Sequence, residues 1–229
     1  MALHSARDVV SRIFYQRCFY LFVALLVLLS VVPFLPSSMN GRILLNWVNA
    51  FLVVATVATV GRSIFSFLVA LLLATASLLF QWMGLHVGSH TWQAWSWILG
   101  ALLYATTAYY LVRYVFDPTV MSTDKLFGAA AAFLVLGVMW AFLYEIVGHY
   151  VPGSFLVEGK PGSLDYLQAV YLSISVLTSN GFGDISPLGQ QARGLASIEQ
   201  VVGTLFLAVL IARLASDYPR GRAKGGGVR

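Results

Sequence analysis

Charged residues and cysteine are scarce in this chain. Lys, Arg, Asp and Glu make up only 10% of its 229 residues, whereas 59% are hydrophobic and the mean hydropathy is +0.81. This composition excludes an ordinary soluble globular domain and predicts an integral membrane protein. The single cysteine, Cys18, excludes an intramolecular disulfide and a cysteine-based metal site.

The net charge of +5 does not indicate a nucleic-acid partner. The basic residues stand in short connections and near the ends of the chain rather than on one dense face, so a lipid membrane is the expected partner. With both termini in the cytoplasm, 11 of the 14 basic residues lie inside. The inside residues are Arg7, Arg12, Arg17, Arg62, Arg113, Lys125, Arg213, Arg220, Arg222, Lys224 and Arg229, and the outside ones are Arg42, Lys160 and Arg193.

That distribution fits six membrane spans, which the long apolar runs predict independently. The runs cover residues 18–35, 42–60, 64–83, 92–116, 127–150 and 192–216. Residues 42–83 contain twice the length that one crossing needs, so we expect a tight inner hairpin at Arg62.

A polar segment with alternating glycines, residues 178–184 (TSNGFGD), lies between the last two predicted spans. Non-helical backbone at membrane depth must be buried by protein or must line a water-filled path. The apolar run 164–177 before it, with Ser163 as a candidate cap, predicts a short helix that re-enters the membrane. The C-terminal end of that helix would stabilise a cation at the segment, where the glycines allow successive carbonyls to face one axis.

This combination of re-entrant helix, glycine segment and membrane helix resembles the pore module of tetrameric potassium channels, and the whole chain resembles their bacterial six-span members. The resemblance covers residues 127–216, where Arg193 and Gly203 stand at the family's post-filter arginine and hinge glycine. Before residue 127 only the number of spans is similar. The resemblance implies a homotetramer in the plasma membrane, here the bacterial inner membrane, with potassium ions in the filter and no other cofactor.

The resemblance also implies the filter residues. They are Thr178, Ser179, Asn180, Gly181, Phe182, Gly183 and Asp184, and the carbonyls of Ser179, Asn180, Gly181 and Phe182 would coordinate the ion. The family's filter typically reads T-V-G-Y-G, so Asn180 and Phe182 are departures from it. A potassium channel is therefore the first hypothesis, with a nonselective sodium/potassium channel or a non-conducting channel-like subunit as the alternatives.

Two features of the last span carry further hypotheses. Gln200, Thr204, Leu207 and Ile211 share one helical face, which by the resemblance lines the pore, although ordinary helix packing would give the same pattern. Glu199 is ionisable within the membrane, so it is a candidate for a regulatory role or for a hydrogen bond to the re-entrant helix.

Other functions find little support in the sequence. The fourth predicted span carries only Arg113, so we expect weak or no voltage dependence. The pairs Glu145–His149 and His86–His90 are more typical of solvent-facing or structural residues than of a zinc site. No serine or cysteine has a convincing paired base, so we do not expect an enzyme.

The sequence thus predicts an all-α membrane protein with six transmembrane helices, and a re-entrant pore helix and filter loop between helices five and six. Its predicted parts are a basic cytoplasmic N-terminus (1–17), a four-helix domain similar to a voltage sensor without the arginine repeat (18–116), a linker (117–126), a pore domain (127–216) and a basic cytoplasmic tail (217–229).

Overall fold

The computed structural model describes residues 17–31, 34, 50–56, 64–87, 90–117 and 123–217. The helices are α2 (Arg17–Val31), α4 (Ile64–Val87), α5 (His90–Val115), α6 (Thr123–Tyr150), α7 (Tyr166–Leu177) and α8 (Gln190–Asp217), and the strands are β1 (Phe155–Val157), β2 (Lys160–Gly162) and β3 (Ile185–Pro187). Residues 50–56 are helical as well.

Four helices are long and apolar enough to cross a membrane. They are Ser66–Gly84, Thr91–Val115, Asp124–Tyr150 and Gln190–Ala215, and they match the third to sixth predicted spans. The described helix of the first predicted span ends at Val31, and only residues 50–56 of the second are described. The hairpin at Arg62, nearly all of the N-terminal segment and nearly all of the tail lie outside the described residues, so six spans remain a prediction.

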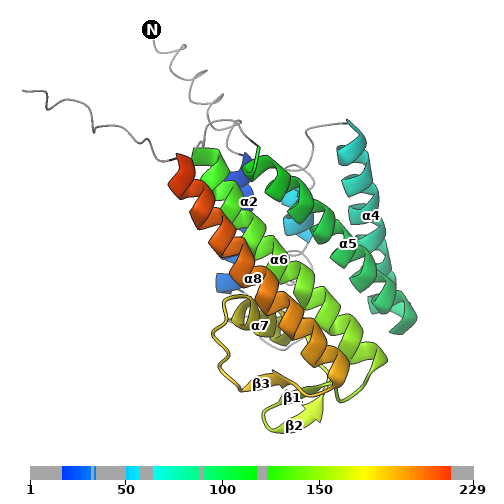
Figure 1. The fold of residues 1–229 in the computed structure, drawn as a ribbon. Helices are drawn as coiled ribbons and strands as arrows, with labels where there is room; N and C mark the ends of the chain where they lie inside the picture. Colours follow the sequence, from blue (N-terminus) through cyan, green and yellow to red (C-terminus); the bar gives the residue numbers. More distant parts are fainter. Residues whose placement is uncertain are drawn as a thin grey trace, which may run out of the picture.

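Helix α6 is the centre of the fold, because α2, α5, α7 and α8 all pack against it (Figure 1). Small residues let its neighbours approach closely. A Cβ at Gly128 of α6 would lie 3.3 Å from the sulfur of Cys18 on α2, and a Cβ at Gly100 of α5 would lie 3.2 Å from the Phe142 ring. Helix α4 packs against the outer side of α5.

A small antiparallel sheet lies at one end of this helical layer, beside α7 (Figure 1). Its strand order is β2-β1-β3, and Phe155 at the start of β1 pairs with Gly162 and with Pro187. The hairpin between β1 and β2 turns through Glu158 and Gly159, which have φ angles of 49° and 77°. This sheet cannot be predicted from the sequence, because strands of three residues are too short to show an alternating pattern.

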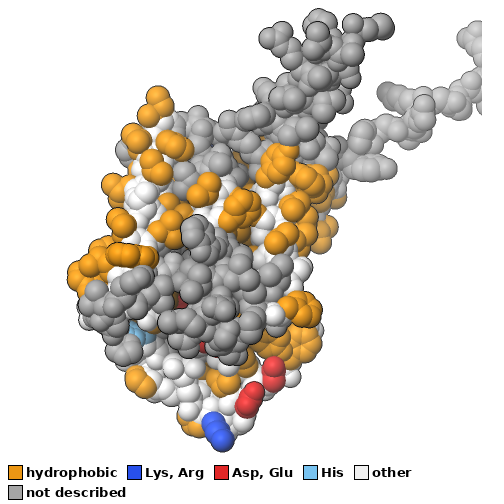
Figure 2. Space-filling view, turned by 180° about the vertical axis from the view of Figure 1, so that it is seen from behind, with side chains coloured by type: hydrophobic (Ala, Val, Ile, Leu, Met, Phe, Trp, Pro, Cys, Tyr) orange, Lys and Arg blue, Asp and Glu red, His pale blue; other side chains and the backbone are white. Residues whose placement is uncertain are grey.

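The helices differ in how much of their surface the single chain covers. In the most apolar stretch of α4 and of α8, only 17% is buried inside the chain, compared with 56% in α6. Figure 2 shows hydrophobic side chains spread over one face, with the charged ones mainly at the end that carries the sheet. Lipid or other protein must therefore cover much of α4 and α8.

Candidate functional site

Helix α7 begins with a capping box. The Asp165 carboxylate accepts a hydrogen bond from the Gln168 backbone N–H at 2.8 Å, and the Gln168 side chain accepts one from the Asp165 N–H at 3.1 Å. Two backbone donors are satisfied in this way. The prediction that Ser163 caps this helix is wrong, because the Asp165–Gln168 pair stabilises a start two residues later.

The segment predicted as a filter, which we call the glycine loop (residues 178–184), leaves α7 through its last turn. The Thr178 N–H and hydroxyl both donate to the Ile174 carbonyl, at 3.0 and 2.7 Å, and the Ser179 N–H donates to Val176 at 2.9 Å. The Asn180 N–H donates to the Ser175 carbonyl at 2.9 Å. The first amides of the loop are thus bonded back to α7.

The backbone of the glycine loop alternates in conformation. Ser179, Gly181 and Gly183 have φ angles of 57°, 57° and 87°, whereas the residues between them do not have positive φ. A Cβ at either glycine would meet no atom within 4 Å, so glycine is needed for the φ angle rather than for space. Ser179 takes the same region at a cost of roughly 1–2 kcal/mol.

No described residue donates a hydrogen bond to the four carbonyls between Ser179 and Phe182. Their oxygens are therefore free of protein donors within the described chain. Because buried or membrane-embedded carbonyls need a partner, such a row of oxygens suits a cation.

The far end of the loop is fastened to α7 by Tyr171. Its hydroxyl donates to the Asp184 carboxylate at 2.9 Å, and its ring stacks on Phe182 with the ring centroids 5.9 Å apart. The Asp184 carbonyl accepts from the Glu158 N–H at 3.3 Å, and β3 begins at the next residue. Phe182 has no hydroxyl group. The hydrogen bonds that hold this end of the loop come instead from Tyr171 and from Glu158 next to β1, and both are made to Asp184.

Glu199 on α8 contacts both α6 and α7 and is 0% exposed. Its carboxyl group accepts a hydrogen bond from the Tyr144 hydroxyl of α6, and its other oxygen lies within hydrogen-bonding distance of the Ser173 hydroxyl of α7. The Ser173 oxygen is also 2.7 Å from the Gly137 carbonyl of α6. Glu199 is recognisable in the sequence as an ionisable residue within a membrane span, whereas Tyr144 and Ser173 are not, because hydroxyl residues inside apolar helices have no distinguishing spacing.

Glycines bring the long helices into contact with α7. A Cβ at Gly203 of α8 would lie 2.3 Å from the Leu177 carbonyl oxygen, and one at Gly137 of α6 would lie 2.6 Å from the Ile174 side chain. Gly203 therefore has a packing role at the end of α7. Its role as a hinge stays a prediction.

The four residues predicted to line a pore are all exposed in the single chain. Leu207 and Ile211 are 40% and 65% exposed, and the Thr204 hydroxyl donates to the Gln200 carbonyl one turn earlier, at 2.9 Å. These four residues form one uncovered side of α8, the helix that follows the glycine loop and β3 in the chain.

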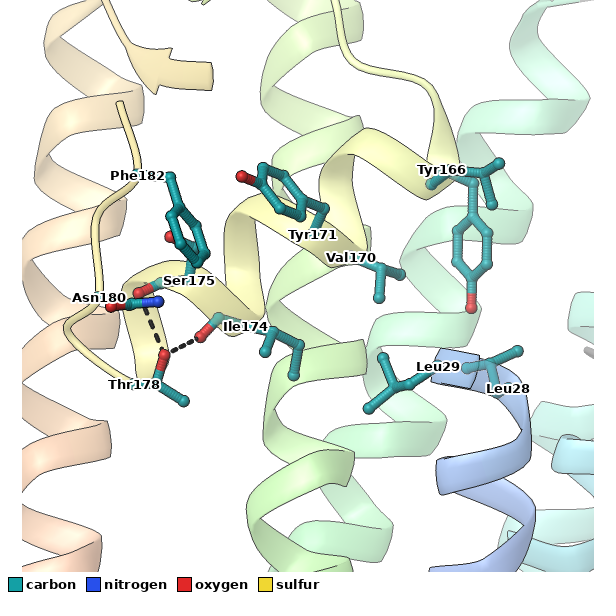
Figure 3. A pocket seen from close by; sticks show the side chains of 11 residues that line it. Leu28, Leu29, Tyr166, Val170, Tyr171, Ile174, Ser175, Thr178, Asn180 and Phe182 are labelled. Carbon is teal, nitrogen blue, oxygen red and sulfur yellow. Dashed lines mark hydrogen bonds between the residues drawn. The ribbon is translucent and has the colours of Figure 1, made fainter. Parts of the chain in front are cut away.

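An apolar cavity of about 290 Å³ separates the end of α2 from α7 and the glycine loop (Figure 3). Its lining residues are Leu28, Leu29, Tyr166, Leu167, Val170, Tyr171, Ile174, Ser175, Thr178, Asn180 and Phe182. The Asn180 side chain is exposed and makes no hydrogen bond to the described part of the chain. The departures from the family's filter sequence thus lie beside this cavity.

At the opposite end of α8, polar groups join the helix to the segment between α5 and α6. Arg213 and Lys125 donate to the same carbonyl, that of Asp117, at 3.1 and 3.0 Å. The Tyr114 hydroxyl of α5 donates to the Asp124 carboxylate of α6 at 2.9 Å. The last part of α8 is therefore attached to the start of α6.

The residues considered for metal binding lie elsewhere. The His149 ring packs edge-on against Trp97, with centroids 5.5 Å apart, and Glu145 is buried in α6. The side chains of His86 and His90 lie outside the described residues. Within the described ranges, no three His, Cys, Asp or Glu residues come together as a metal site.

The part of the chain that contains the glycine loop matches a known protein family. A family described as "Ion channel" matches residues 131–218, which include most of α6, the sheet, α7, the glycine loop and α8. Protein LctB of Bacillus caldotenax is 31% identical to the chain over 105 residues, which are 43% of this chain and 75% of that protein. No solved structure matches the chain.

Proposed function

The chain belongs to the ion channel family, and on that premise we propose that it is a passive, potassium-conducting cation channel whose selectivity filter is the glycine loop. The observation that carries this proposal is the row of carbonyls between Ser179 and Phe182, which receive no hydrogen bond from the described chain. The alternating φ angles of the loop allow such carbonyls to serve as ligands in sequence.

Helix α7 suits the role of a re-entrant pore helix. Its 12 residues make it about 18 Å long, which is shorter than the roughly 30 Å hydrocarbon core of a bilayer. Its C-terminal end leads directly into the loop, so the partial negative charge of the helix end would favour a cation there.

A complete pore requires several copies, because each chain contributes only one loop. We propose a homotetramer in which Gln200, Thr204, Leu207 and Ile211 of each α8 line the inner cavity. The exposure of this side of α8 in the single chain supports that arrangement. The proposed topology has six spans with both ends in the cytoplasm, in a plasma membrane that we expect to be the bacterial inner membrane.

Recording the purified protein in planar bilayers, with potassium on one side and sodium on the other, tests this function. A reversal potential near the potassium equilibrium value is the expected result. A reversal potential near zero would instead support the nonselective channel that Asn180 and Phe182 make the second candidate. Absence of current from correctly assembled protein would support a non-conducting subunit.

Two glycine variants show whether the current passes through the loop. Gly181→Ala places a side chain at a φ angle of 57° and should abolish the current. Gly194→Ala on α8 introduces a Cβ that meets nothing within 4 Å, so this variant should conduct like the wild type. Equal currents from both variants would contradict the proposed filter.

The double variant Asn180→Val/Phe182→Tyr tests the two departures from the T-V-G-Y-G sequence. If they relax selectivity, restoring the family's residues should raise the potassium-to-sodium permeability ratio by about tenfold or more. An unchanged ratio would show that these two side chains do not limit selectivity.

A further inference from the structure

The hydroxyl of Ser173 has two close oxygen neighbours, and this fixes how hydrogens are distributed around Glu199. One neighbour is the Gly137 carbonyl oxygen at 2.7 Å, and the other is a carboxyl oxygen of Glu199 within hydrogen-bonding distance. A hydroxyl group carries one hydrogen, so it can point along a near-linear, full-strength hydrogen bond toward only one of them. The second contact needs a hydrogen from the neighbouring group.

The Gly137 carbonyl has no hydrogen to give, whereas a carboxyl group can carry one. Both contacts are hydrogen bonds only if Glu199 donates to Ser173 and Ser173 donates to Gly137. The Tyr144 hydroxyl then donates to the other oxygen of Glu199, which acts as the carbonyl of the acid. In this arrangement the hydrogens of Tyr144, Glu199 and Ser173 each have one acceptor.

The surroundings of Glu199 agree with a neutral side chain. It is 0% exposed, and no described Lys, Arg or His forms an ion pair with it. The groups that face it are the hydroxyls of Tyr144 on α6 and Ser173 on α7. Because an ionised carboxylate in such a site would lack a compensating cation, the acid form is the less costly one.

We propose that Glu199 is a neutral carboxylic acid that positions α7, by donating a hydrogen bond to Ser173 while it accepts one from Tyr144. The resulting relay runs from α8 to α7 and on to the backbone of α6. It lies one helical turn from Gly203, where α8 touches the end of α7. The position of α7 relative to both long helices would therefore depend on one proton held by Glu199.

This inference deepens the proposed function where it concerns conduction, since α7 is the proposed pore helix. The protonation state itself can be measured without any current. Infrared difference spectra of wild type minus Glu199→Gln at neutral pH should show the C=O stretch of a protonated acid, and this band should shift in D₂O. Glu145→Gln is the matched control, because Glu145 is the other carboxyl group that is buried among the described side chains of α6 and α8.

A protonated-acid band that is lost in Glu199→Gln and kept in Glu145→Gln supports the proposal. A spectrum in which the Glu199→Gln difference shows only carboxylate bands at neutral pH would overturn it. This result would leave the proposed channel function intact, so the two failures can be told apart.

Substitutions test the bond directions. Glutamine can donate from its amide N–H to Ser173 and accept from Tyr144, so Glu199→Gln should keep the wild-type permeability ratio within about twofold. Glu199→Ala and Ser173→Ala each break the relay and should lower the midpoint of thermal denaturation in detergent by about 2–12 °C. Loss of stability in Glu199→Gln equal to that in Glu199→Ala would contradict a neutral acid, because the amide matches only the protonated form.

Discussion

At the scale of single residues, the Tyr171 hydroxyl ties the far end of the glycine loop, at Asp184, to α7. Tyr171→Phe removes the hydrogen bond to Asp184 but keeps the ring stacked on Phe182. We expect the outer end of the loop to loosen, so the potassium-to-sodium permeability ratio should fall by about threefold or more. Reversal potentials under mixed-ion conditions measure this ratio.

The control for Tyr171→Phe is Tyr109→Phe on α5, where the side chain is 59% exposed and lies outside the proposed pore domain. This variant should leave the ratio unchanged. If both variants behaved like the wild type, the bond between Tyr171 and Asp184 would have no part in selectivity.

Gly203 should tolerate no side chain. The Cβ of Gly203→Ala would lie 2.3 Å from the Leu177 carbonyl, which is backbone and cannot rotate away. Overpacking of this kind typically costs about 1–3 kcal/mol, so the variant should denature at lower temperature and lose current. Gly194→Ala on the same helix is the matched control, and a stable, conducting Gly203→Ala protein would refute the contact.

At the scale of elements, the sequence predicts the long helices well and the small ones less well. Uninterrupted apolar runs placed the spans of α4, α5, α6 and α8 within a few residues of the helices in the structure. The start of α7 was placed too early, because both Ser163 and Asp165 are good cap residues and only the return bond from Gln168 distinguishes them.

Contacts between distant parts of the chain could not be predicted. The sheet depends on pairing between β1 and β3, which are separated by α7 and the loop. The bonds of Glu199 to Tyr144 and Ser173 likewise join residues 55 and 26 positions away. Spacing along one helix reveals which residues share a face, but it carries no information about the partner on another helix.

The capping box gives a prediction for α7 as an element. Asp165→Ala removes the acceptor for the Gln168 N–H, so it should reduce the stability of the folded protein by about 0.5–2 kcal/mol. Asp165→Asn keeps a side-chain oxygen at the same place and should lose less. Thermal denaturation in detergent compares the two, and equal loss in both variants would show that charge rather than capping matters here.

At the scale of the whole molecule, the uneven burial of the helices indicates what surrounds the chain. Helix α6 is covered on several sides by its own chain, whereas α4 and α8 are both largely uncovered. In the proposed tetramer the two uncovered helices have different surroundings. Helix α4 would face lipid, while α8 would face the pore and the neighbouring copies.

The membrane helices also set a limit on the response to voltage. Moving one charge across the membrane is worth about 2.3 kcal/mol per 100 mV, and steep voltage dependence needs three to four such charges per subunit. Helix α5, which packs along α6, carries a single basic residue, Arg113, in its last turn. We expect the conductance of the wild type to change by less than about threefold over about 200 mV, with Arg113→Gln indistinguishable from it. Steady-state conductance measured in bilayers tests both statements. A steep curve equivalent to several gating charges per subunit would show that charges outside α5 cross the membrane field.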